Sequence, residues 1–414
     1  MKNLSKIRTI NSKTLIATVD ISKNNHSGYF RTIEDKEIKP FKFSNTMSGF
    51  MQYWKRLQAF KEQNKLNEIV FAFEPTGSYG IPLIHYMKSK GARLIQVNPM
   101  HTKRIKEIGD NSPNKTDSKD PKVIADLVCL GHGLTANIPE GLIADLRHEI
   151  LFRENLMEDI NRIKNRIEGL LVQFFPEFLK IMKGFNSKTS IYLLTYYIFP
   201  IAIIESGVTR LSKEIKKVSN GRLGEARAKK LINSAKNTIG IHEGTEGMKS
   251  VINAYIKQLD LLTTQLKEKE LIIENMLGKI SYSHLLISMK GIGKITAAIL
   301  ISEVLDFKSY STIPQIIKLA GLNLYEVSSG KHKGYRRISK RGRTLLRKAL
   351  YFASLNMIRK GGIFHEEYQN HLSKGMKKIK AVIAISKKLL RTIYSMVRNN
   401  TEYIENYETF KKAA

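Results

Sequence analysis

The sequence predicts an α/β domain with a mixed sheet, then a helical connector, then a mainly α-helical C-terminal domain. Strand and helix patterns alternate over the first third of the chain. Apolar residues repeat at the spacing of paired helices through the middle, and a basic helical pattern with glycine breaks fills the last third. A chain of 414 residues suits two or three domains at about 150 residues each. We expect these domains over residues 1–145, 146–280 and 281–414.

The first three strands are expected to form an antiparallel meander. Residues 15–20 (LIATVD) have the composition of a buried strand. Residues 28–33 and 37–43 carry β-branched or aromatic side chains with turn signals between them. Short connections of this kind join antiparallel neighbours. Asn45 can then cap a helix that runs to about Gln63.

Two later strands are separated by helical segments. Residues 69–74 (IVFAFE) are strongly apolar, and Pro75-Thr76-Gly77 breaks the strand before another helix. Residues 93–97 form the fifth strand. Alternation of strand and helix favours parallel pairing within one sheet. The first third of the chain therefore predicts a mixed sheet with helices packed on it.

Two segments in the middle third have the apolar spacing of coiled-coil seams. Steps of three and four residues separate Leu156, Ile160, Ile163, Ile167, Leu170 and Phe174, and again Ile252, Tyr255, Leu259, Leu262 and Leu266. These segments could pair as an antiparallel hairpin within one chain, or between chains in an oligomer. The apolar run over 191–204 contains Pro200 and is short for a membrane span of about 20 residues, which favours a buried helix pair.

The charge of the chain indicates a polyanionic partner. Lys plus Arg number 69 and Asp plus Glu number 37, which gives 69 − 37 = +32. Basic side chains that neutralise phosphates release counterions and so favour nucleic-acid binding. An anionic membrane surface has the same attraction. The single cysteine, Cys129, excludes an internal disulfide and a cysteine-rich zinc site, and it suits a reducing cytoplasm.

Four carboxylates are candidates for a metal site. Asp20 and Glu74 each end an apolar strand, and Asp117 and Asp120 lie three residues apart at an expected helix start. Functional groups gather at strand ends in open sheets, and converging carboxylates repel one another without a cation. Oxygen ligands select Mg²⁺ or Mn²⁺, and two such ions can clamp both reacting oxygens of a phosphodiester. Asp117 and Asp120 could instead cap the helix, and a strand-end aspartate is commonly a turn residue.

A glycine turn and a basic run indicate where the last third meets nucleic acid. Gly291-Ile292-Gly293, followed by Lys294, predicts a helix-hairpin-helix turn whose backbone can approach a phosphate. An ordinary helix–helix loop is the alternative. Residues 331–348 hold nine Lys or Arg and no acid. Phosphate contacts, with a solvated face as the alternative, are expected from Arg336, Arg337, Lys340, Arg341 and Arg343.

Several of these motifs occur together in one family, and the chain resembles the DEDD-type insertion-sequence transposases related to the Piv and MooV DNA invertases. These are described as bridge-RNA-guided recombinases. The N-terminal likeness rests on Ala17-Thr18-Val19-Asp20, Phe73-Glu74-Pro75-Thr76-Gly77 and Lys115-Thr116-Asp117-Ser118-Lys119-Asp120. The C-terminal likeness rests on Gly291-Ile292-Gly293, Gly321-Leu322, Ser329-Gly330, Ile338-Ser339-Lys340-Arg341-Gly342 and Leu346-Arg347.

The resemblance implies that Asp20, Glu74, Asp117 and Asp120 form a metal site on a RuvC-like, ribonuclease-H-type fold. It also implies that Ser329 attacks DNA and holds a transient phosphoserine bond, although serine is a weak nucleophile unless it is activated. Donor and target DNA, a structured noncoding guide RNA and a dimer or tetramer are the implied partners. No membrane is expected, and the protein should act at the nucleoid in the cytoplasm.

The chain departs from the family pattern at Leu324, where proline is frequent, at Arg343, where asparagine is frequent, and at Pro121, where alanine is common. Ser328 is the alternative nucleophile if the serine loop is shifted by one residue. A junction-resolving endonuclease that uses only metal-activated water is the competing enzyme. A binding protein with a decayed site is the third hypothesis, which the intact acid set disfavours.

Overall fold

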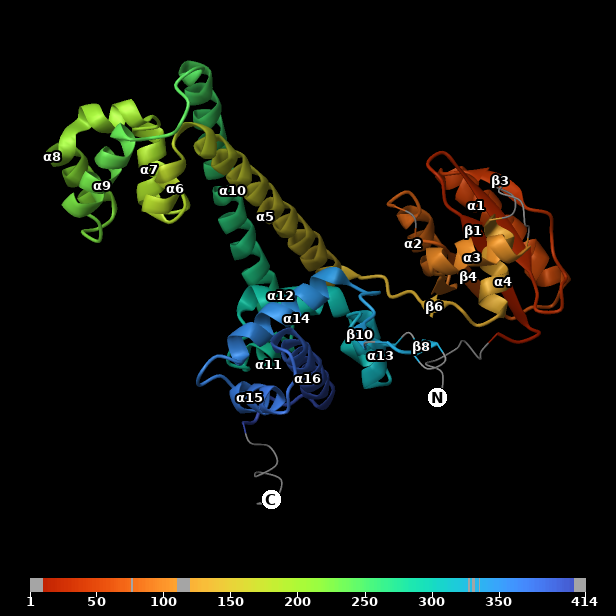
Figure 1. Ribbon diagram of the computed structural model, residues 1–414. Helices are drawn as coiled ribbons and strands as arrows, with labels where there is room; N and C mark the ends of the chain where they lie inside the picture. The colour runs from red at the N-terminus through yellow and green to blue at the C-terminus, as the bar shows by residue number, and fades with distance from the viewer. Residues whose placement is uncertain are drawn as a thin grey trace. The chain divides into compact units, whose positions relative to one another are not determined.

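The computed structural model describes residues 10–75, 77–109, 120–326, 328–329, 332–334 and 336–405. These residues form two compact units, the first ending at Ile138 and the second beginning at Pro139. Both are drawn in Figure 1. Each unit is described by itself below.

The first unit is built on a six-stranded sheet with the strand order β3-β2-β1-β4-β5-β6. The pairs β1/β2, β2/β3 and β5/β6 are antiparallel, whereas β1/β4 and β4/β5 are parallel. This confirms the mixed sheet. The strands are β1 (Thr14–Asp20), β2 (Asn25–Arg31), β3 (Phe41–Ser44), β4 (Glu68–Phe73), β5 (Arg93–Gln96) and β6 (Leu134–Thr135).

Besides the second strand, which was expected over 28–33 and spans Asn25–Arg31, two details of this sheet differ from the sequence expectation. The third strand begins only at Phe41, because Glu37 makes no more than an isolated bridge to Arg31. The edge strand β6 was not expected, since two residues carry no periodicity from which a strand could be recognised. The fold class is unchanged by either difference.

Helices cover both faces of the sheet. One face packs against α1 and α2 through an aromatic core that includes Tyr53 and Phe71, and the other face packs against α4. The expected cap at Asn45 was wrong: Thr46 is the N-cap, and its side chain accepts a hydrogen bond from the Gly49 N–H. The helices are α1 (Met47–Gln63), α2 (Ile81–Ser89), α3 (Pro99–Gly109) and α4 (Asp120–Cys129).

The second unit begins with a long antiparallel helix pair, α5 (Gly141–Phe174) and α10 (Thr245–Gly278). Figure 1 shows the two side by side. Arg153 and Glu270 form an ion pair of 2.8 Å towards one end, while Phe174 packs with Ile252 towards the other. Of the two pairings that the apolar spacing allowed, the one within a single chain is therefore observed.

A small helical module lies between the long helices in the sequence. Its core includes Leu193, Ile203, Leu211 and Leu231, which confirms a buried helix pair over the apolar run. No single described helix is long and apolar enough to span a membrane, although α7 and α8, bent by 114°, pass such a test together. The module consists of α6 (Pro176–Met182), α7 (Lys188–Tyr196), α8 (Pro200–Val218) and α9 (Glu225–Lys236).

The C-terminal region is mostly helical, as expected. Its core joins α12, α14 and α16 to the first turns of α5 through residues such as Leu146, Leu300 and Leu389. The helices are α11 (Ser283–Ile287), α12 (Lys294–Val304), η1 (Phe307–Ser309), α13 (Ile313–Leu319), α14 (Thr344–Met357), α15 (His365–Ser373) and α16 (Lys378–Asn399). Four short strands interrupt them: β7 (Leu324–Tyr325), β8 (Ser328–Ser329), β9 (His332–Lys333) and β10 (Arg337–Ile338).

Candidate active site

Asp20 and Glu74 are neighbours at the carboxyl ends of β1 and β4, the two central strands of the sheet. Val19 pairs with Phe73 across the parallel strands β1 and β4; Asp20 is the last residue of β1, and Glu74 directly follows β4. Adjacent strands lie about 4.8 Å apart. Both side chains are half-buried. Parallel pairing thus brings together two carboxylates that are 54 residues apart in the sequence.

These two carboxylates continue the sheet face that α4 covers. Side chains alternate between the two faces along a strand. Ile16 of β1 and Ala72 of β4 belong to the core formed with α4, whereas Val19 and Phe73 belong to the core on the opposite face. Asp20 and Glu74 have the same parity as the α4-facing residues. We therefore place them beside the helix that begins at Asp120.

The start of α4 is tied to β1 by a buried hydrogen bond. The hydroxyl of Thr18 donates to the carbonyl oxygen of Pro121 at 2.6 Å, and the Thr18 side chain is fully buried. Thr18 stands two residues before Asp20, and Pro121 directly follows Asp120, which is half-buried. This bond fixes the first turn of α4 against the C-terminal part of β1.

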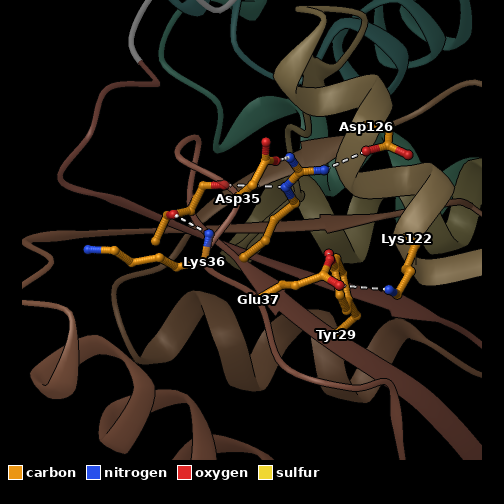
Figure 2. A network of polar contacts seen from close by, with 8 residues as sticks. Tyr29, Asp35, Lys36, Glu37, Lys122 and Asp126 are labelled. Carbon is orange, nitrogen blue, oxygen red and sulfur yellow. Dashed lines mark hydrogen bonds and ion pairs between the residues drawn. The ribbon is translucent and has the colours of Figure 1, made fainter.

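A network of polar contacts fixes the rest of α4 against β2 (Figure 2). Arg31 pairs with Asp126 at 2.5 Å and also with Asp35. Lys122 pairs with Glu37 at 2.9 Å, and the hydroxyl of Tyr29 donates to the same carboxylate. The helix therefore has two polar attachments beyond its apolar face.

The same network shifts the ionisation of its members. Hydrogen bonds from Tyr29 and then from Lys122 are the main causes that hold the pKa of Glu37 below its ordinary value. Burial, followed by the hydrogen bond to Glu37, raises the pKa of Tyr29. Glu37 therefore stays charged and Tyr29 neutral at physiological pH, which keeps the attachment of α4 intact.

Asp20, Glu74 and Asp120, together called the carboxylate corner, have a donor chemistry that fits a hard divalent cation. They offer carboxylate oxygens, which Mg²⁺ and Mn²⁺ prefer. In the described part of the chain, which includes Asp20, Glu74 and Asp120, no three carboxylate, imidazole or thiol side chains are grouped closely enough to hold an ion, so these three acids do not form a complete ion site in this arrangement. The fourth expected ligand, Asp117, lies outside the described residues.

The expected nucleophile lies in an arm that leaves the C-terminal helices. Ser329 of β8 pairs with His332 of β9, and Ser328 pairs with Lys333, which makes a tight antiparallel hairpin. The outer strands of the arm, β7 and β10, pair through Leu324 with Ile338. Along the chain, the β8–β9 hairpin thus lies between the paired strands β7 and β10, which join the arm to the helices.

Several residues that carried the family resemblance hold the base of this arm. Gly321 has φ of +66°, and a Cβ there would come within 2.8 Å of Arg347. The Arg347 guanidinium donates to the carbonyls of Ala320 and Lys340 at 3.1 and 3.3 Å. The Ser339 hydroxyl donates to the Asn323 side chain at 2.6 Å. These motif residues therefore build the arm.

The basic residues expected to contact phosphate do not share one environment. Arg337, Lys340 and Arg341 are exposed. Arg336 is 75% exposed and pairs with Glu326 at 2.8 Å. Arg343 differs, because its guanidinium donates to the backbone carbonyl of Glu303 and burial lowers its pKa. The Arg343 side chain therefore packs inside the domain and is not on the surface with the other three arginines and Lys340.

The glycine turn expected to bind phosphate is a helix–turn–helix unit. Gly291, with φ of +111°, lies between α11 and α12, and a Cβ there would meet the Met357 side chain at 2.8 Å. Gly293 is the N-cap of α12, with no side chain capping it. Lys294 pairs with Glu274 at 2.8 Å and remains 59% exposed. Gly291 is therefore required for packing on α14.

Sequence reasoning missed three positioning features. The Thr18 hydroxyl was not singled out, although a threonine within an apolar strand two residues before a candidate ligand is a recognisable signal. The network of Arg31, Glu37, Lys122 and Asp126 carries no such signal, because its members come from distant segments. The buried pair Arg147–Glu303, at 2.6 Å, likewise depends on tertiary packing.

Comparison with known proteins finds similarity at both ends of the chain. Residues 17–176 match the DEDD domain of IS110, described as a transposase, and residues 283–369 match the transposase IS116/IS110/IS902 family. The chain is 23% identical over 388 residues to the uncharacterized 43.6 kDa protein of insertion element IS110 from Streptomyces coelicolor, covering 93% of this chain and 94% of that protein.

Two other insertion elements encode similar proteins. The uncharacterized 44.8 kDa protein of IS116 from Streptomyces clavuligerus is 23% identical, covering 80% of this chain and 83% of the relative. The uncharacterized 42 kDa protein of IS900 from Mycobacterium paratuberculosis is 22% identical, covering 81% and 84%. The first matched region contains Asp20, Glu74 and Asp120, and the second contains Ser329.

Proposed function

The chain belongs to the IS110-type DEDD transposases, enzymes that cut and rejoin DNA, and from this premise we propose how its two matched regions divide the chemistry. The carboxylate corner of the first region holds divalent cations and a DNA phosphate. The arm of the second region supplies Ser329 as the nucleophile. Residues 1–145, 146–280 and 281–414 serve as the catalytic domain, the connector and the serine-bearing domain.

The placement of Asp20 beside Glu74 supports the metal site most directly. The two carboxylates lie at the carboxyl ends of adjacent parallel strands, and the Thr18–Pro121 hydrogen bond ties the first turn of α4, where Asp120 lies, to β1. We propose that Asp117 and a phosphate oxygen of DNA complete the ligand set. Mg²⁺ or Mn²⁺ bound there supplies charge that stabilises the attacking and leaving oxygens of a phosphodiester. The protein's own part is to hold the carboxylates at fixed positions.

Ser329 carries the strand transfer in this proposal. Its hydroxyl oxygen attacks the phosphorus, the bond to one sugar oxygen breaks, and the serine proton ends on that leaving oxygen. The product is a phosphoserine link between protein and DNA. A sugar hydroxyl of another strand then attacks the same phosphorus, and the serine leaves with the proton of that hydroxyl. Phosphodiester bonds are thereby exchanged without an external energy source.

A covalent-adduct assay tests the nucleophile. Wild-type protein, incubated with Mg²⁺ and end-labelled element DNA, should give a labelled protein band in a denaturing gel. Ser329→Ala should remove that band and recombination, whereas the matched control Ser328→Ala should keep both. If Ser329→Ala still cuts DNA, the enzyme is a junction-resolving endonuclease that uses metal-activated water. If only Ser328→Ala loses the band, Ser328 is the nucleophile.

We further propose that the working enzyme is a homo-oligomer guided by a noncoding RNA at the nucleoid. The net charge of +32 suits simultaneous contact with DNA and RNA. Mixing Asp20→Asn with Ser329→Ala protein should restore recombination if the two sites act from different protomers. Nucleic acid that copurifies with the protein should include RNA encoded beside its gene. Its absence from active preparations would contradict guidance by RNA.

A further inference from the structure

The hairpin of α8 and α9 repeats the construction of the α11–α12 hairpin. Each second helix begins at a glycine N-cap that no side chain caps, Gly224 in α9 and Gly293 in α12. Four residues later stands a fully buried alanine, and seven residues later a fully buried leucine. In α9 these are Ala228 and Leu231, and in α12 they are Ala297 and Leu300.

Positive charge is concentrated on this hairpin. Between positions 210 and 236 the chain has nine Lys or Arg and two Glu, which gives 9 − 2 = +7. Besides Lys229, four exposed cations surround the turn and the first half of α9, namely Lys216, Lys217, Arg222 and Lys230. Like charges so close together repel one another, so a polyanion bound there would relieve a local cost.

Both glutamates of the segment pair with cations other than these four. Glu225 pairs with Lys229 at 2.7 Å. Glu214 accepts from Arg210 at 3.2 Å and from the Tyr197 hydroxyl at 2.5 Å. Among the residues that the structure describes, no carboxylate pairs with the four cations at the turn. Their charge is therefore not neutralised locally.

The turn presents these cations on an ordered backbone. The Gly221 N–H donates to the Lys216 carbonyl at 2.8 Å, and the Leu223 N–H donates to the Ser219 hydroxyl at 2.9 Å. Gly221 has φ of +80°, where other residues are strained. Because the backbone is fixed, Arg222 is held between the ends of the two helices.

We propose that the α8–α9 hairpin is a surface that binds duplex DNA. It contacts the phosphate backbone and does not recognise the base sequence. The amides at the start of α9 have no side-chain cap, and a phosphate at the turn can accept from them. Lysine is a point charge that suits phosphate more than a base edge. This inference rests on the DNA-transposing activity, but not on Ser329 or the carboxylate corner.

Binding of the full chain to a short duplex of arbitrary sequence tests the proposal without any cutting. The test variant replaces the four cations with glutamine: Lys216→Gln, Lys217→Gln, Arg222→Gln and Lys230→Gln. The matched control removes four exposed charges from α10 and its C-cap in the same unit: Lys249→Gln, Lys257→Gln, Lys267→Gln and Lys279→Gln. Fluorescence anisotropy across a salt series gives affinity, and circular dichroism establishes that both variants are folded.

The test variant should bind DNA at least about tenfold more weakly than the control variant. The slope of log affinity against log salt is negative, and each lost phosphate contact makes it less steep by about 0.9. Loss of four contacts therefore reduces the magnitude of the slope by up to about 3.6. Equal affinities and slopes for the two variants would overturn the proposal. So would a loss confined to duplex RNA with DNA binding unchanged, because the surface would then hold RNA.

A second variant remains informative if the first is poorly folded. Ala226 is exposed in the first turn of α9. Ala226→Glu places an acid where the helix dipole stabilises it, so the helix should not weaken, while a phosphate at the turn is repelled. DNA affinity should fall several-fold relative to Ala226→Gln. Unchanged affinity in Ala226→Glu would contradict the hairpin as a phosphate contact, and activity of Ser329 has no bearing on the result.

Discussion

Replacing Thr18 with valine should reduce DNA cutting far more than it reduces stability. The Thr18 hydroxyl joins β1 to the first turn of α4 at 2.6 Å, between Asp20 on the strand and Asp120 on the helix. Valine has nearly the same shape, so the fully buried site stays filled. The variant therefore removes this bond, together with a longer one of 3.4 Å to the Tyr29 carbonyl, and little else.

The expected magnitudes differ between the two readouts. Loss of the hydrogen bonds of this one buried hydroxyl should cost about 1 kcal/mol, or roughly 4 °C in melting temperature for a unit of this size. A displacement of a catalytic group by about 1 Å can cost about 100-fold in rate. Since the bond sets the position of Asp120 relative to Asp20, cutting should fall by about 10- to 100-fold.

Thr14→Val is the matched control. Thr14 is also fully buried on β1, and its hydroxyl donates to the Asn11 side chain at 3.2 Å. It stands six residues from Asp20, about 20 Å along the strand. Thermal unfolding and a plasmid-cutting assay should show similar melting losses for both variants, but a loss of cutting only for Thr18→Val. Equal cutting by the two variants would refute a positioning role for Thr18.

Three further changes test other parts of the structure. Arg147→Met should cost about 3–5 kcal/mol in urea unfolding, because Glu303, only 3% exposed, is left as an unpaired buried charge. Adding Glu303→Leu should recover most of that loss, and no recovery would contradict the pairing. Because the pKa of Glu37 is lowered in the fold, its ionised form adds stability above about pH 4.5 that is lost as the pH falls. Stability of Glu37→Gln should therefore decline less than that of the wild type between about pH 6 and about pH 3.5, and equal declines would count against the network. Asp20→Asn should weaken calorimetric Mn²⁺ binding to the DNA complex by about tenfold or more, whereas Asp35→Asn, at an 81% exposed side chain, should not. EDTA should abolish DNA cutting by the wild type, and added Mg²⁺ should restore it. Cutting that persists in EDTA would show that the carboxylates act without a metal ion.

The strands that carry the acids were predictable, because each is a short apolar run ended by a carboxylate. Residues 15–20 and 69–74 were placed within one residue of β1 and β4. The spacing of Leu156 to Phe174 and of Ile252 to Leu266 predicted two helices that pack together. The two-residue strand β6 and the cap at Thr46 were missed, since single residues and very short strands leave no periodic pattern.

The serine arm shows where motif resemblance and structure give different information. The resemblance singled out Gly321, Ser339 and Arg347 as a group, but it did not say what they do. The structure places all three at the base of the arm, where they bond to one another's segments. Arg343 was grouped with the exposed cations from its charge alone. Its inward hydrogen bond to Glu303 depends on α12, which lies 40 residues away in the sequence.

The sequence by itself determined the local patterns of the chain. These are acids that follow apolar strands, a run of cations without interleaved acids, and two helices whose apolar residues have matching spacing. Those features are local, so periodicity and composition express them directly. Only the tertiary structure decided which distant groups meet. The parallel register that sets Asp20 beside Glu74, the Thr18–Pro121 bond and the bond from the Tyr197 hydroxyl to Glu214 of α8 all join separate segments. Such contacts depend on how strands and helices pack, and no local pattern encodes them.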